Sequence, residues 1–157
     1  MRSTLILIVV ASVFLVLGHS AQSDPPPAQL GVAGGFGNAL GVPVSSGSLI
    51  VVAPESRDSI VAWSHDSGVW NRIPIKPKPQ DAIVPIVGND VAAIRVGKMV
   101  YGYGAESGKW HWIKTEAGNA PSVGNRSVTV SDGDWYYAFS AKAGKWSGLN
   151  LKTGETR

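Results

Sequence analysis

From residue 48 onward, short apolar runs alternate with polar turns, and the same order occurs three times along the chain. None of these runs continues long enough with a 3.6-residue apolar period to indicate an amphipathic helix. Each unit reads as three strands joined by turns, over about residues 48–79, 88–118 and 126–152. The pattern therefore predicts an all-β fold built from three repeated three-stranded antiparallel meanders, similar to propeller blades and arranged as an open stack or an incomplete propeller.

A nine-residue segment marks the second turn of every unit. In each copy an aromatic residue is followed seven positions later by tryptophan, and glycine stands two positions before that tryptophan. The tryptophans are 40 and then 36 residues apart, periods that are typical of a repeated supersecondary unit. The aligned residues of the three copies are Trp63, Gly68 and Trp70; Tyr103, Gly108 and Trp110; and Phe139, Gly144 and Trp146.

Equivalent positions of a repeat usually have equivalent packing roles. We therefore expect the aligned aromatic residues to form a ladder of core side chains between sheets, and the aligned glycines to set the turns. Stacking of sugars or aromatic ligands is the alternative role. The repeat does not account for Trp112 and Trp135, which makes them the better candidates for ligand contact.

The units resemble kelch-type β-propeller blades, in which an aromatic strand end, a polar turn and a tryptophan are followed by an aliphatic residue. That residue is Ile73, Ile113 or Leu149, three positions after the tryptophan. The turn is also similar to the turn of quinoprotein-type propeller repeats. The glycine pair of kelch repeats is missing, and the period is shorter than the kelch period of about 50 residues. Closed propellers typically have four to eight blades, whereas this chain has three units.

Three units leave two outer sheet faces uncovered unless a ring closes. Three arrangements remain open: a short stack capped by the N-terminal segment, a ring completed by two or more chains, or a piece of a longer repeat protein.

The first 23 residues have the pattern of an export signal. Arg2 is followed by an almost wholly apolar run over residues 5–17, and Ala21 and Ser23 have the small size that signal peptidase requires. An uncleaved anchor is the alternative. Residues 24–47, rich in Pro and Gly, are expected to form a linker, without order through about residue 30. The expected location is outside the cell, in the periplasm or in the cell envelope.

Charge and cysteine content narrow the possible partners. The formal net charge of +3 becomes about +2 once Arg2 is removed, which is too small and too evenly spread for nucleic-acid binding. The chain has no cysteine, so disulfides and thiolate zinc sites are excluded. We expect no cofactor, and an unknown protein or glycan as partner, with self-association as the way to complete a ring.

Few residues are candidates for chemistry. His65 and His111 occupy non-equivalent repeat positions, and Asp132 and Asp134 lack the other spaced ligands of a calcium loop, so we expect no metal site. No nucleophile elbow or catalytic carboxylate pair is evident, and we expect no catalytic residue. Asn125 begins a glycosylation sequon, which matters only in a eukaryotic host. The sequence favours a non-enzymatic module for protein binding or envelope structure; the alternative is a carbohydrate-binding or glycan-acting propeller relative.

Overall fold

The structure is a computed structural model that describes residues 40–157. The expected signal peptide and residues 24–39 of the expected linker lie outside the described residues. Within residues 40–157, no helix is long and apolar enough to cross a membrane.

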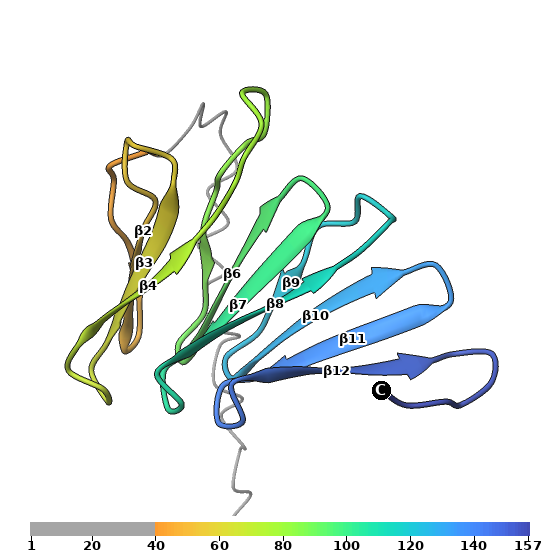
Figure 1. Cartoon of the computed structure of the whole chain (residues 1–157). Coiled ribbons are helices and arrows are strands. Elements are labelled where there is room, and N and C mark those ends of the chain that lie inside the picture. The colour runs from red at the N-terminus through yellow and green to blue at the C-terminus, as the bar shows by residue number, and fades with distance from the viewer. Residues whose placement is uncertain (1–39) are drawn as a thin grey trace, which may run out of the picture. The chain divides into compact units, whose positions relative to one another are not determined.

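The described chain forms twelve strands in three four-stranded antiparallel sheets (Figure 1). Sheet 1 contains β1 (Val44–Ser46), β2 (Leu49–Val52), β3 (Ser59–Ser64) and β4 (Trp70–Pro74). Sheet 2 contains β5 (Ile86–Val87), β6 (Val91–Val96), β7 (Met99–Gly104) and β8 (Lys109–Lys114). Sheet 3 contains β9 (Ser122–Val123), β10 (Ser127–Asp132), β11 (Trp135–Ser140) and β12 (Lys145–Asn150).

The predicted all-β fold of three repeated antiparallel meanders is confirmed, and the described sheets do not close into a barrel. They are blade-like and propeller-like in their repetition. Each sheet also has a short first strand that the sequence analysis did not anticipate: β1, β5 or β9. These strands have only two or three residues, too few to show the alternation of apolar and polar positions that identifies a strand. β1 lies inside the stretch expected to be a linker and pairs with β2 from Val44↔Val51 to Ser46↔Leu49.

Sheet 2 lies between the other two sheets, and its faces contribute to two different hydrophobic clusters. We call the face of a sheet that points toward the preceding sheet in the chain its leading face, and the opposite face its trailing face. Side chains alternate between these faces along each strand. Ile94 and Tyr103 of the leading face are buried against sheet 1. Val91 and Val100 of the trailing face are buried against sheet 3.

The turn before each repeated tryptophan has the same geometry in all three sheets. Gly68, Gly108 and Gly144 have φ values of 64°, 61° and 62°. Their N–H groups donate to the carbonyl four residues earlier, each at 2.9 Å. A side chain is strained in this left-handed region, which explains why glycine stands at this position in every copy.

Candidate functional site

Neighbouring sheets are joined by a repeated contact of the aligned tryptophans. The indole Nε1 of Trp110 donates to the main-chain oxygen of Asn71 at 3.0 Å. In the same way, Nε1 of Trp146 donates to the main-chain oxygen of His111 at 3.2 Å. Each acceptor is the residue directly after the tryptophan of the preceding sheet. The repeat therefore encodes a sheet-to-sheet interface as well as a blade.

Aromatic pairs and main-chain hydrogen bonds complete this interface. Trp110 packs on Tyr103 with ring centroids 5.0 Å apart, and Trp146 packs on Phe139 at 5.4 Å. Trp146 is only 9% exposed. At the equivalent turns, the N–H of Ser48 donates to the oxygen of Asn89 at 3.1 Å, and that of Asp90 donates to the oxygen of Asn125 at 2.8 Å. The interface between sheets 1 and 2 and the interface between sheets 2 and 3 are therefore made by equivalent contacts.

The leading face of sheet 1 has the residues of this interface but no preceding sheet among residues 40–157. Strand register places Trp63 beside both Ile50 and Trp70, and Val52 beside Val61. Trp70 is 56% exposed, and the other four side chains are partly exposed. Trp70 therefore departs from the prediction of a buried ladder, because the sheet that would cover it and accept its N–H is missing from the described chain.

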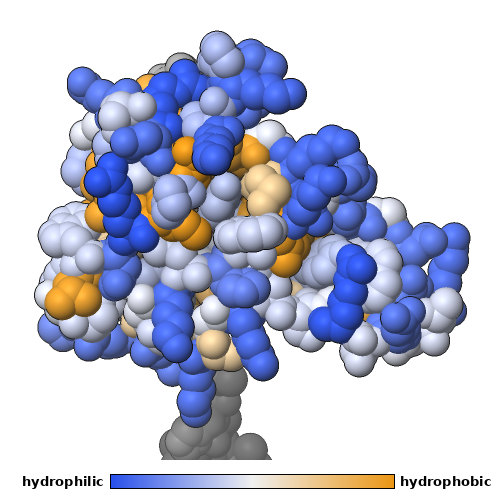
Figure 2. All heavy atoms as spheres, in the orientation of Figure 1, coloured by the Kyte–Doolittle hydropathy of each residue, from blue (hydrophilic) through white to orange (hydrophobic). Residues whose placement is uncertain are grey.

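The trailing face of sheet 3 is polar by contrast. It consists of exposed or partly exposed side chains, chiefly Ser127, Thr129, Ser131, Tyr136, Ala138, Ser140, Lys145 and Ser147, with one exposed aliphatic side chain, Leu149, beside Tyr136. At the first two of these positions sheet 1 has Leu49 and Val51, both buried. Figure 2 shows hydrophobic side chains at the surface at the left and centre of the view and mostly hydrophilic ones at the right, where sheet 3 lies. The described stack therefore has one apolar end and one polar end.

The two tryptophans outside the ladder differ in accessibility. Trp112 on β8 is 52% exposed and available to a ligand. Trp135 is partly buried, and the guanidinium of Arg157 lies over its ring, 3.8 Å from the centroid. Its ring also stacks on Tyr137 at 6.2 Å. The contacts of Trp135 are thus internal, and Trp112 is the better placed of the two.

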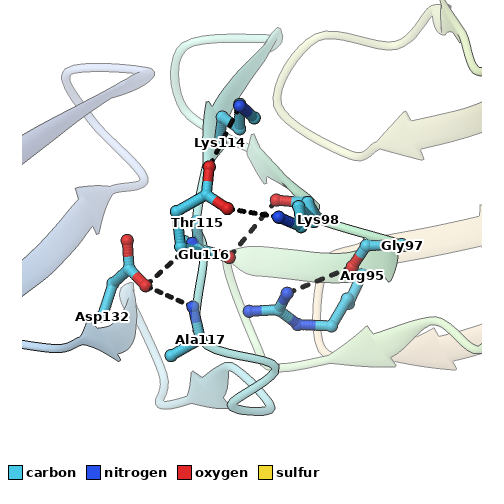
Figure 3. A network of polar contacts seen from close by, with 8 residues as sticks. All are labelled: Arg95, Gly97, Lys98, Lys114, Thr115, Glu116, Ala117 and Asp132. Atoms are coloured by element: carbon cyan, nitrogen blue, oxygen red, sulfur yellow. Dashed lines mark hydrogen bonds and ion pairs between the residues drawn. The ribbon is translucent and has the colours of Figure 1, made fainter.

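The two histidines lie at different places in the fold. His65 is exposed in the turn after β3, and its ring lies edge-on to Trp63 of the leading face of sheet 1, with ring centroids 6.4 Å apart. His111 is exposed on β8 of sheet 2. Asp132 accepts hydrogen bonds from the N–H groups of Glu116 and Ala117 at 2.8 and 2.6 Å, and so holds the loop between sheets 2 and 3 (Figure 3). Among residues 40–157 no group of three His, Asp or Glu side chains is placed to hold a metal ion. Asn125 is exposed.

A pocket of about 360 Å³ lies where the segment before β5 meets the loop before β9. Arg95 lines it, and Nη1 of Arg95 donates to the oxygen of Gly97 at 3.1 Å (Figure 3). Its Nε and Nη2 are buried without a hydrogen-bond partner. Burial lowers the pKa of Arg95, and the charge of Asp132 opposes that shift. The equivalent residues are Ala53 and Ser131, so the repeat does not require this arginine. The pocket-lining residues include Asp81, Val84, Ile86, Ala120 and Pro121.

Lysines surround Glu116 at the edge of the same loop. Lys98 and Lys114 both pair with its carboxylate, the second at 3.0 Å (Figure 3). The hydrogen bonds from these lysines lower the pKa of Glu116 to about 2. All three side chains are exposed, which is typical of a surface ion cluster.

The sequence analysis did not single out two features that matter here. The different polarity of the two end faces could have been found by aligning Ser127 and Thr129 with Leu49 and Val51. The burial of Arg95 had no local signal, because it depends on two loops that lie far apart in the sequence.

No family model matches the chain, and no curated protein matches it. Among solved structures it is similar to the crystal structure of Kluyvelomyces marxianus Hsv2, with a TM-score of 0.39 and 9% sequence identity. The alignment covers 70% of this chain and 36% of that chain, so the present chain spans about a third of the length of that protein.

Proposed function

We propose that the protein is an exported, non-enzymatic β-repeat module of the kelch-like kind, located outside the cell or in the cell envelope. It binds another protein through the leading face of sheet 1. The observation that carries this proposal is the exposure of Trp70, whose equivalents Trp110 and Trp146 each contact a preceding sheet. The face offers a connected apolar surface and one indole N–H donor, which suits a protein surface with apolar side chains and a main-chain carbonyl.

The residue type of Trp70 and the apolar residues near it both favour protein docking at this face over a surface that binds nothing. An aromatic residue that is rigid and amphipathic, such as Trp70, is the residue type that most often anchors protein interfaces. In addition, strand register places Trp63 beside both Trp70 and Ile50, and Val61 beside Val52, on the same face. The apolar surface is therefore contiguous up to Arg72, which lies beside Val61. Contiguous exposed apolar surface is uncommon on soluble chains except where something binds.

The proposal can be tested by photo-crosslinking. The full chain, with the photo-reactive residue p-benzoylphenylalanine at position 70, is expressed in the cells that naturally produce the protein (the producing cells). The matched control carries it at position 136, because Tyr136 is 41% exposed on the polar trailing face of sheet 3. We expect irradiation to give a defined protein adduct from position 70 and none from position 136. The absence of an adduct at position 70, or the same adducts at both positions, would overturn the proposal.

Glycan binding is the second candidate function, and the exposure of Trp112 favours it. Sugars stack on exposed indole rings, so a bound polysaccharide would quench tryptophan emission or shift it to the blue. The control is the Trp112→Ala variant, which would lose the response. A flat titration across a broad panel of glycans would exclude this candidate.

A further inference from the structure

We propose that the docking partner is a different protein with an exposed β-sheet face of aliphatic and small residues, and that a second copy of this chain docked head to tail does not fit. This inference rests on the proposed docking function of the leading face of sheet 1 and specifies the chemistry of its partner. The surfaces that cover the equivalent faces of sheets 2 and 3 indicate what this face fits.

Both covered leading faces meet the same kind of surface. Tyr103 and Trp110 of sheet 2 lie in one cluster with Leu49, Val51 and Ile60 of the sheet 1 trailing face. Phe139 and Trp146 of sheet 3 lie in one cluster with Val91, Ala93 and Val100 of the sheet 2 trailing face. Each aromatic pair therefore shares a cluster with three aliphatic positions on two strands. The equivalent residues of sheet 1, the partly exposed Trp63 and the exposed Trp70, are suited to the same kind of surface.

The trailing face of sheet 3 does not provide that surface. The positions of Leu49, Val51 and Ile60 are occupied by Ser127, Thr129 and Tyr136 in the aligned repeat. A second copy docked head to tail would bury their hydroxyl groups against apolar side chains, which is unfavourable without new hydrogen bonds. Terminal repeats of stacked proteins commonly have such a polar outer face.

The distance between neighbouring backbones does not explain why a second copy would not fit on sheet 3. Neighbouring sheets approach closely, because a Cβ at Gly104 would lie 2.2 Å from the oxygen of Ala141. Sheet 1 has Ala62 and Ser64 at the positions equivalent to Gly102 and Gly104, and it still packs on sheet 2. Sheet 3 has the same residue types there, Ala138 and Ser140. The polar side chains of β10 and β11 are therefore the feature that separates sheet 3 from sheets 1 and 2.

The outer edge of sheet 3 is also closed. Arg157 and Gly148 exchange two main-chain hydrogen bonds of 2.7 and 2.9 Å, and the N–H of Asn150 donates to the oxygen of Glu155 at 2.8 Å. A paired edge is less open to strand addition by another chain. We expect neither the paired edge nor the polar trailing face of sheet 3 to bind another chain. Association through the leading face of sheet 1 should therefore add a single partner. Head-to-tail contacts that repeat would instead give rings or filaments.

The size of the face sets the strength of the complex. The four strands of sheet 1 have three to six residues each. With strands about 4.8 Å apart and about 3.3 Å per residue, they give a sheet face of roughly 300 Å². This is less than half of the roughly 800 Å² per partner that a standard stable interface buries. We therefore expect reversible association that is detected at high protein concentration.

The inference can be tested without the natural partner. In the variant Ser127→Leu, Thr129→Val, Tyr136→Ile, sheet 3 acquires the aliphatic residues of the sheet 1 trailing face. A further substitution in the same chain, Trp70→Lys, disables its own leading face. Wild-type protein and this quadruple variant are each expected to be monomers. Their mixture is expected to form a 1:1 heterodimer in batch light scattering at high protein concentration, with no larger species.

Two controls keep the result interpretable. Near-ultraviolet circular dichroism and a cooperative thermal transition must show that the quadruple variant is folded. If it does not fold, the single variants Ser127→Leu and Thr129→Val are each combined with Trp70→Lys and tested for a smaller shift in mass. Mixing the quadruple variant with a Trp70→Lys chain, which lacks a leading face, should leave two monomers.

Each outcome decides a separate claim. If folded variants and wild type do not associate, or if wild type alone dimerises through Trp70, the inference on partner chemistry is overturned. If the heterodimer forms but position 70 gives no adduct in the producing cells, the partner chemistry stands and the proposed function fails. An adduct at position 70 without heterodimer formation means that the natural partner offers another kind of surface.

Discussion

The indole N–H of Trp110 donates to the main-chain oxygen of Asn71, the residue directly after Trp70. This hydrogen bond joins one copy of the repeat to the preceding copy, and Trp146 makes the same bond to the main-chain oxygen of His111. Trp70 is the first of the three in the chain, and residues 40–157 hold no earlier copy for it to contact. The same residue type is thus a core residue in two sheets and a surface residue in the third.

The first prediction follows from this difference. Trp110→Ala is expected to lower the free energy of unfolding by about 3–5 kcal/mol, because it removes packing on Tyr103 and the bond to Asn71. Trp70→Ala is the matched control and should change it by less than about 1 kcal/mol, since the side chain is 56% exposed. Urea unfolding measures both. Equal losses in the two variants would show that Trp70 is covered in the full chain.

A second prediction concerns the close approach of sheets 2 and 3. Gly104→Ala would place a Cβ 2.2 Å from the oxygen of Ala141, so one backbone must move. Overpacking of this kind typically costs about 1–3 kcal/mol, and backbone contact puts this site at the upper end. Gly118→Ala is the control, because a Cβ there meets no atom within 4 Å and its φ is not positive. A thermal midpoint unchanged in Gly104→Ala would contradict the observed spacing.

Features of the fold that depend on residues close together in the chain could be predicted from the sequence, and features that depend on the assembly of sheets could not. The three meanders and their turns follow from local alternation and from residues such as Gly108, which a turn requires within a few positions. β1 did not follow, because three residues give no period. The exposure of Trp70 also did not follow, since it is set by the number of sheets and not by the repeat unit. Repeat alignment indicates what a residue can pack against, and only the assembly decides whether that partner is present.

A third prediction concerns pH. The pKa of Glu116 is lowered from 4.5 to about 2, with its hydrogen bond from Lys98 as the first cause and that from Lys114 as the second. A lowered carboxyl pKa stabilises the fold above pH 4.5, and this contribution is lost as the pH falls from there toward 2. The thermal midpoint should therefore fall across this range in wild type and fall less steeply in Glu116→Gln. Because the pair is exposed, the difference should shrink in high salt. Parallel pH profiles of the two proteins would contradict the assignment.

The last prediction concerns Arg95, whose charge is the least well satisfied in the described core. Two of its nitrogen atoms are buried without partners, and burial lowers its pKa. A buried charged group without full hydrogen bonding is unfavourable, so replacing it by an apolar side chain of similar length removes that cost. Arg95→Met is expected to leave the free energy of unfolding unchanged or to raise it by about 1 kcal/mol or more. The control Arg72→Met breaks an exposed pair with Asp58 and should lower it by less than about 1 kcal/mol. A marked loss of stability in Arg95→Met alone would mean that ordered water satisfies the guanidinium, and the pocket beside it would then be a hydrated polar site.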